Sequence, residues 1–203
     1  MRKIMFNDAF CLTQAVLSGT KTMTRRLLKV PKTCNGKEVY SFNILTNNAG
    51  TQCVDLVDEN GGVLDSWKPH YEVGEVVAIA QSYKEVYPNA DFEMVDGNFM
   101  TESAGWTNKM FVKADLMPRH IKITDVKIER LQDISVDDIL CEGVWQFYDN
   151  KNLFYVSKNI GYAPDVAFLS AREAFWYLID HISGKGTWES NPWVVAYSFE
   201  LVD

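Results

Sequence analysis

The stretch Gly19-Thr20-Lys21-Thr22-Met23-Thr24-Arg25-Arg26 carries three cations and three hydroxyl groups in eight residues. It directly follows a short apolar helical pattern, for which Asp8 is a suitable N-cap and Gly19 supplies the left-handed residue that ends a helix. We therefore expect a helix over about residues 9–18. The β-branched residues that follow favour a strand, which Pro31 would stop. The stretch is thus predicted to lie at a helix-to-strand corner.

Positive charge is concentrated at the N-terminal end of an acidic chain. Residues 1–32 carry seven Lys or Arg against one acid, whereas the whole chain of 203 residues has a formal net charge of −7. Such a segregated field attracts an anionic partner such as a phosphate. The alternative needs no ligand, because cations just past a helix C-terminus also complement the helix dipole and its free carbonyls. Spacing alone favours neither explanation.

Length and composition predict a soluble, cytoplasmic globular protein. A hydrophobic share of 47% in 203 residues is enough for a core. No apolar run approaches the ~20 residues that span a bilayer, and the N-terminus meets Asp8 before any hydrophobic region adequate for a secretory signal. The four cysteines and three histidines are scattered without a CxxC pair. The sequence therefore predicts no metal site and no cofactor.

Strand signals are spread over the middle of the chain. Turn residues at 47–50 and 59–62 enclose a strand-like segment, which predicts an inserted β-hairpin or meander within residues 32–72. An apolar run from Val76 to Tyr83 predicts a strand buried on both faces. Residues 109–114 have the character of a short strand.

In residues 120–131 the apolar positions change phase, from Ile121 and Ile123 to Val126 and Ile128. A regular strand would turn half of these side chains outward. One extra residue near Thr124 restores the pattern, so we expect a β-bulge or bend there.

Two capping boxes predict helices in the second half of the chain. Ser135 to Asp138 opens a short helix that carries Glu142 in its last turn and that Gly143 can end. Ser170 to Glu173 opens a longer helix with an apolar stripe at helical spacing. After Pro192, alternating apolar residues predict a closing strand with one core-facing side, at Trp193, Val195, Tyr197, Phe199 and Leu201.

Three motifs in this order resemble the ASCH domain, a PUA-like fold. They are the helix that ends in Gly-x-Lys-Thr-x-Thr-x-Arg (19–26), Tyr71-x-x-Gly74-Glu75 ahead of an apolar strand, and the closing Asn191-Pro192-Trp193-Val194. The longer versions common in phage and prophage genomes also match at 128–134 and Glu142-Gly143. The resemblance implies an α+β domain over residues 1–203, with a mixed β-barrel flanked by helices and insertions at about 33–70, 84–108 and 144–169.

The resemblance also implies an activity. Small bacterial members of the family are N4-acetylcytidine amidohydrolases, and their catalytic positions fall on Lys21 as proton acceptor, Thr24 as nucleophile and Glu142 as proton donor. At pH 7, neutralising a lysine of ordinary pKa (~10.4) costs about 4.6 kcal/mol. Burial and the neighbouring arginines would lower this cost, whereas ionised Glu142 would raise it. Lys21 and Thr24 would converge only if the corner were irregular, because residues three apart face opposite sides of a regular strand.

This chain departs from the small enzymes in its length and in the cation at position 25. PUA-like domains more generally bind RNA or nucleotides through basic side chains, which here are Arg25 and Arg26 beside Thr22. Binding of RNA or a modified nucleotide is therefore the first interpretation, and hydrolysis of an N-acylated pyrimidine nucleoside is the alternative. A third alternative, a protein-interaction module, would be distinguished by an exposed apolar patch larger than the cleft.

Overall fold

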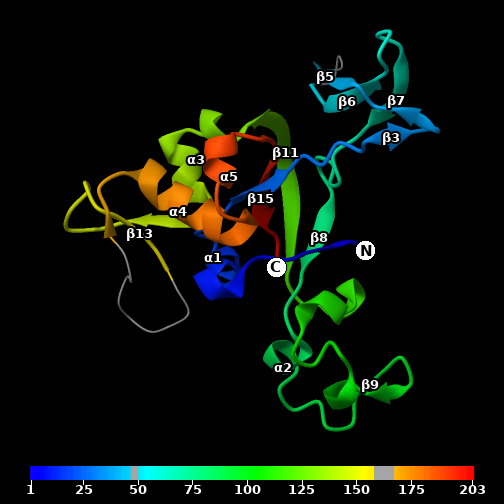
Figure 1. Ribbon diagram of the computed structural model, residues 1–203. Helices are drawn as coiled ribbons and strands as arrows, with labels where there is room; N and C mark the ends of the chain where they lie inside the picture. Colours follow the sequence, from blue (N-terminus) through cyan, green and yellow to red (C-terminus); the bar gives the residue numbers. More distant parts are fainter. Residues whose placement is uncertain (47–49, 158–166) are drawn as a thin grey trace.

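A five-stranded mixed sheet forms the centre of the protein in a computed structural model that describes residues 1–46, 50–157 and 167–203 (Figure 1). Its order is β1-β8-β11-β15-β2, with β1 parallel to β8 and every other pair antiparallel. The strands are β1 (Lys3–Ile4), β8 (Val76–Ile79), β11 (His120–Arg130), β15 (Trp193–Leu201) and β2 (Met23–Leu27). The α+β class is thus confirmed. Within the described residues no sheet closes into a barrel, so the barrel stays a prediction.

The first helical segment is broken in two. A 3₁₀ turn (Asp8–Phe10) is followed by α1 (Leu12–Leu17), and Cys11 between them has a left-handed backbone with φ 53°. Asn7 caps the turn in place of the expected Asp8, whose carboxylate accepts from the Thr13 hydroxyl instead. Gly19 has φ 74°, as expected for the residue that ends the helix.

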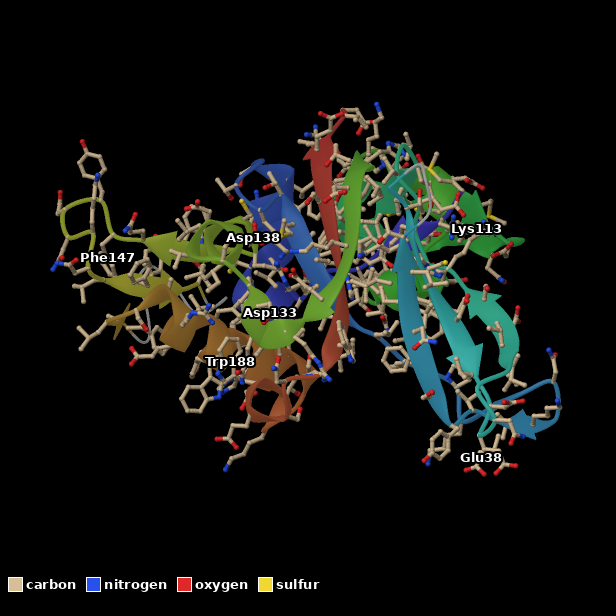
Figure 2. All side chains as sticks on the ribbon, turned by 90° about the horizontal axis from the view of Figure 1, so that it is seen from above. Glu38, Lys113, Asp133, Asp138, Phe147 and Trp188 are labelled. Atoms are coloured by element: carbon tan, nitrogen blue, oxygen red, sulfur yellow. The ribbon has the colours of Figure 1, made fainter. Side chains whose placement is uncertain are left out.

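The segment expected to hold a meander does so. A hairpin of β3 (Thr33–Cys34) and β4 (Lys37–Glu38) precedes the antiparallel sheet of β5 (Ser41–Thr46), β6 (Gln52–Val57) and β7 (Val63–Trp67). This arm projects from the central sheet, with Glu38 at its far end (Figures 1 and 2). Most of the first predicted turn, at 47–49, lies outside the described residues.

The next segment contains α2 (Tyr83–Val86), the hairpin of β9 (Met94–Val95) and β10 (Asn98–Phe99), and three 3₁₀ turns at 100–102, 109–111 and 114–116. The predicted strand at 109–114 is therefore wrong, since the Asn108 side chain accepts from Met110 N and starts a 3₁₀ turn. The strand predicted over 76–83 ends at Ile79. A capping box between Ser82 and Glu85 begins α2 there instead.

Three helices and a small sheet lie beside the central sheet, on the side away from the projecting arm (Figure 1). The helices are α3 (Val136–Cys141), α4 (Ala171–Ser183) and α5 (Thr187–Ser190), and the sheet consists of β12 (Val144–Gln146), β13 (Phe154–Val156) and β14 (Ala167–Phe168). Ser135 and Ser170 cap α3 and α4, as predicted. Among the helices of the described residues, none combines the length and apolar character that a membrane span needs.

The predicted bulge in β11 is confirmed. Ile123 pairs with Phe199 and Asp125 pairs with the adjacent Ser198, so Thr124 is the extra residue. As a result Ile121, Ile123, Val126 and Ile128 are all buried. The closing strand β15 differs from its prediction, because Val194 and Ala196 are buried as well. Between β11 and β2 the strand is buried on both faces from Val194 to Tyr197, and only its end at Glu200 is exposed.

Candidate functional site

The corner between α1 and β2 is irregular. The backbone amides of Thr20 and Lys21 both donate to Ala15 O, each at 2.9 Å, so the chain leaves the helix in a tight turn. β2 begins only at Met23. Lys21 therefore precedes the strand, and the alternation of side chains along β2 does not determine the direction of its side chain. Lys21 and Thr24 can thus reach the same site, as the predicted irregular corner requires.

A cavity of about 110 Å³ lies at this corner and contains most of the predicted site. Its polar lining includes Lys21, Thr24, Arg25, Arg26 and Glu142, whereas the candidate Thr22 does not line it. The remaining wall is largely apolar and comes from the N-terminal segment, α1 and α4, with Phe6, Leu12, Phe175, Leu178, Ile179 and Ile182. The volume well exceeds the ~10–15 Å³ that one water needs.

Lys21 is buried, with 2% of its surface exposed, and its ammonium has three acceptors. Nζ lies 2.8 Å from Glu142 Oε2, 2.7 Å from the Glu142 carbonyl oxygen and 2.7 Å from Met23 O. Burial lowers the pKa of Lys21 below its ordinary value, and Arg26 and Arg25 act in the same direction against the opposing Glu142 carboxylate. The site thus favours the neutral amine more than water does.

Thr24 is paired with Tyr197 in the sheet and is buried, with 6% of its surface exposed. Its hydroxyl has no hydrogen-bond partner within residues 1–46, 50–157 and 167–203. Because it also lines the cavity, the hydroxyl is available to a molecule bound there.

Arg25 is buried and bonded to three carboxylates. Its Nε and Nη2 donate to Glu129 Oε1 at 2.9 and 2.6 Å, Nη2 donates to Asp138 Oδ2 at 2.8 Å, and Nη1 donates to Glu142 Oε1 at 3.1 Å. Burial alone would lower the pKa of Arg25, but these carboxylates outweigh it and raise the pKa above its ordinary value. Of the three carboxylates, that of Asp138 on α3 is the most accessible, with 31% of its side chain exposed. Sequence reasoning missed Glu129 and Asp138 as members of the site.

Most cations of the basic N-terminal segment are used within the protein. Arg2 forms an ion pair with Glu75, and the Lys3 ammonium donates to Met110 O and Val112 O. With buried Lys21 and Arg25, and with Arg26, which donates to Met5 O, five of the seven are internally bonded. Arg26 is nevertheless exposed, as are the other two, Lys29 and Lys32. The local field is thus weaker than the sequence indicates.

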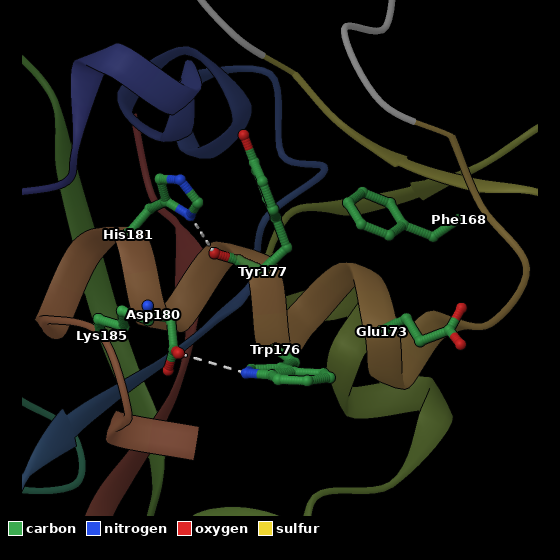
Figure 3. A pocket seen from close by; sticks show the side chains of 7 residues that line it. All are labelled: Phe168, Glu173, Trp176, Tyr177, Asp180, His181 and Lys185. Atoms are coloured by element: carbon green, nitrogen blue, oxygen red, sulfur yellow. Dashed lines mark hydrogen bonds between the residues drawn. The ribbon is translucent and has the colours of Figure 1, made fainter. Parts of the chain in front are cut away.

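The outer face of α4 carries a second, larger hollow of about 580 Å³ (Figure 3). The Tyr177 ring lies between those of Phe168 and His181, at centroid distances of 5.3 and 4.0 Å. The 42% exposed Trp176 donates from Nε1 to Asp180 Oδ2 at 3.2 Å. The rest of the lining is charged, with Glu173 and Lys185. The sequence signal for this hollow was the aromatic pair at 176–177, outside the apolar stripe of the helix.

In the part of the chain that the structure describes, no three His, Cys, Asp or Glu side chains are grouped so as to hold a metal ion. The three carboxylates around Arg25 are arranged about its guanidinium instead. Compared with known proteins, the chain matches no protein-family model, no curated protein and no solved structure.

Proposed function

We propose that the protein hydrolyses the amide bond of an N-acylated pyrimidine nucleoside such as N4-acetylcytidine. One observation carries this proposal. Lys21 and Glu142, 121 positions apart in the sequence, are in contact at 2.8 Å, and they share a cavity with the unbonded hydroxyl of Thr24. The resemblance to the ASCH domain, and with it a PUA-like barrel, belongs to the same proposal.

In the proposed reaction, neutral Lys21 accepts the hydroxyl proton of Thr24 while the Thr24 oxygen attacks the acetyl carbonyl carbon. The C–N4 bond then breaks, and Glu142 delivers a proton to N4 of the departing cytidine. Since Lys21 Nζ is 2.8 Å from Glu142 Oε2, the proton taken from Thr24 can pass along this contact to Glu142. Water finally cleaves the acetyl ester on Thr24, which releases acetate and restores the hydroxyl.

The environment of the three groups supports this chemistry. A lysine base must lose its proton, and burial lowers the pKa of Lys21. The apolar wall from α4 keeps the polar groups in a medium of low dielectric, where their interactions with developing charge are strengthened.

Binding of RNA or a nucleotide without hydrolysis is the second candidate. It is favoured by Arg26, which lines the cavity, and by exposed Lys29 and Lys32 just after β2. Three cations along one segment suit successive phosphates. The internal bonds of Arg25 count against the larger role that this residue had in the sequence-based interpretation.

A protein-interaction module is the third candidate. The hollow on α4 has a larger volume than the cavity at Lys21 and includes the exposed Trp176, which supports this role. Its partner would contact Trp176 and not the Lys21 cavity, because the two hollows lie on different faces of α4.

The decisive experiment is incubation of purified protein with N4-acetylcytidine, followed by chromatography for cytidine and acetate. We expect turnover that falls by at least about 100-fold in Thr24→Ala and in Lys21→Met. Thr20→Ala is the matched control, since Thr20 bonds to Ala15 O and lies outside the cavity. Intact nucleoside after prolonged incubation with the wild-type protein would reject hydrolysis. Thermal stabilisation by the same nucleoside would then favour binding.

A further inference from the structure

We infer that Arg25 is the positioning residue of this site, which orients the Glu142 carboxylate toward Lys21. The inference rests on the proposed function. Glu142 is held between two cations, with Oε2 bonded to Lys21 Nζ at 2.8 Å and Oε1 bonded to Arg25 Nη1 at 3.1 Å. With each oxygen fixed by a different donor, the plane of the carboxylate is fixed as well.

The guanidinium is itself held from two further directions. Glu129 on β11 accepts from Nε and Nη2, and Asp138 on α3 accepts from Nη2. Arg25 on β2 therefore ties the central sheet to the helix that carries Glu142. A planar guanidinium suits this role because its donors point in fixed directions and its orientation is set before substrate binds.

Arg25 also acts on Lys21 through charge. Around Lys21 the charged groups are Glu142 at the end of α3 and Arg25 and Arg26 on β2, and the lining from α1 and α4 carries no charged side chain. Around Arg25 they are Glu129 from β11, Asp138 and Glu142 from α3, and beyond them Lys127, which pairs with Glu129. A second cation beside the amine favours its neutral form, and Arg25 indeed lowers the pKa of Lys21.

Two substitutions separate the orienting effect from the charge effect. Arg25→Lys keeps the cation but loses the fork, so we expect kcat for N4-acetylcytidine to fall about 10- to 100-fold without displacement of the rising limb of the pH–rate profile. Arg25→Gln removes the cation, so the rising limb should move to higher pH and the rate should partly recover there. A structural role alone would lower the rate equally at every pH.

Lys127→Gln is the matched control. It removes the other cation from Glu129 but leaves both contacts to Glu142 in place, so its pH–rate profile should follow the wild type. A profile of Arg25→Gln that coincides with that of Lys127→Gln would overturn the inference.

A measurement without substrate distinguishes this inference from the proposed function. In protein with ¹³C-labelled lysine, the Lys21 side-chain resonance can be titrated by NMR. We expect Lys21 to titrate at higher pH in Arg25→Gln than in the wild type, and at nearly the wild-type pH in Arg25→Lys. An unchanged titration in Arg25→Gln would overturn the inference, even if the wild type is active. Absence of turnover in the wild type would reject hydrolysis alone. If Arg25→Gln does not fold, Arg25→Lys decides, and an unchanged kcat in that variant would overturn the positioning role.

Discussion

The Lys21 ammonium is bonded to Glu142 twice, to its carboxylate at 2.8 Å and to its backbone carbonyl oxygen at 2.7 Å. The carbonyl belongs to the residue that ends α3, so Lys21 satisfies one of the orphan acceptors at that helix terminus. One of the two sequence-based explanations for the cations was that they complement the end of α1, the helix that precedes them. Lys21 complements α3 instead, and the same bond fixes the backbone from which the Glu142 side chain projects.

As pH rises, the contributions of Lys21 and Lys127 to the free energy of unfolding should change in opposite directions. The pKa of Lys21 is lowered in the folded protein, so the unfolded chain binds more protons in the window below ~10.4, and stability rises with pH there. The advantage of the wild type over Lys21→Met in urea denaturation should therefore grow from pH 7 to pH 10. Glu129 raises the pKa of Lys127, so Lys127→Met should show no such gain. Parallel behaviour of the two variants would contradict the burial argument.

Gly143→Ala should destabilise the protein and disturb the site. Gly143 has φ +98°, and a Cβ there would lie 2.8 Å from Leu12 Cδ2 and 3.6 Å from Lys21 Cδ. Left-handed strain costs about 1 kcal/mol and overpacking adds about 1–3 kcal/mol. Gly97→Ala is the control, since Gly97 has φ +80° with nothing within 4 Å and carries the strain alone. Thermal unfolding should give a clearly larger loss of Tm for Gly143→Ala than for Gly97→Ala. Equal losses would show that the contact with Leu12 adds no cost.

If the binding candidate is right, Arg26→Gln, Lys29→Gln and Lys32→Gln together should weaken the binding of single-stranded RNA. The slope of log K against log salt should shrink by about 2, at ~0.7 per phosphate contact. The control replaces three exposed lysines elsewhere, Lys37, Lys84 and Lys151. Fluorescence anisotropy at several salt concentrations measures both. Equal slopes for the two triple variants would show that the segment after β2 does not contact RNA.

Asp180→Asn should lower Tm at neutral pH. The Asp180 carboxylate accepts from Gly186 N and Trp188 N, each at 2.9 Å, and from the Trp176 indole. Burial opposes ionisation, but these hydrogen bonds outweigh it and lower the pKa of Asp180. Its contribution is therefore present above ~3.9, the ordinary pKa, and is lost as pH falls through the lowered value. The difference in Tm between the two proteins should shrink toward pH 3; a constant difference would indicate a steric effect.

Local chemistry accounts for the parts of the fold that could be predicted. The serine caps at 135 and 170, the left-handed Gly19 and the bulge at Thr124 each depend on a few neighbouring residues. The predicted strand at 109–114 failed for the same kind of reason. One side-chain bond from Asn108 decided in favour of a 3₁₀ turn, and strand propensity carries no information about such a bond.

The site was predictable only as far as its motif extended. Lys21, Thr24 and Glu142 do line one cavity, but the burial of Arg25 depends on Glu129 and Asp138, which are brought to it by sheet pairing and by the docking of α3. Long-range partners of this kind leave no local signal. In the sequence, an arginine that is already paired inside the fold cannot be distinguished from one that is free to bind a phosphate.

The extra residue at Thr124 determines on which face of the sheet each later side chain of β11 lies. Arg25 pairs with Ala196 and Glu129 lies opposite Val194, so both charged side chains lie on the even-numbered side of β15. If Thr124 were instead paired in a regular ladder, Glu129 would lie opposite Trp193 on the side of Tyr197, and Ile128 would lie opposite Val194 and present an apolar side chain to the Arg25 guanidinium. The count of residues between the bulge and Glu129 is therefore as strict a requirement of the site as its charges. An insertion or deletion inside this short interval would move Glu129 away from the Arg25 guanidinium.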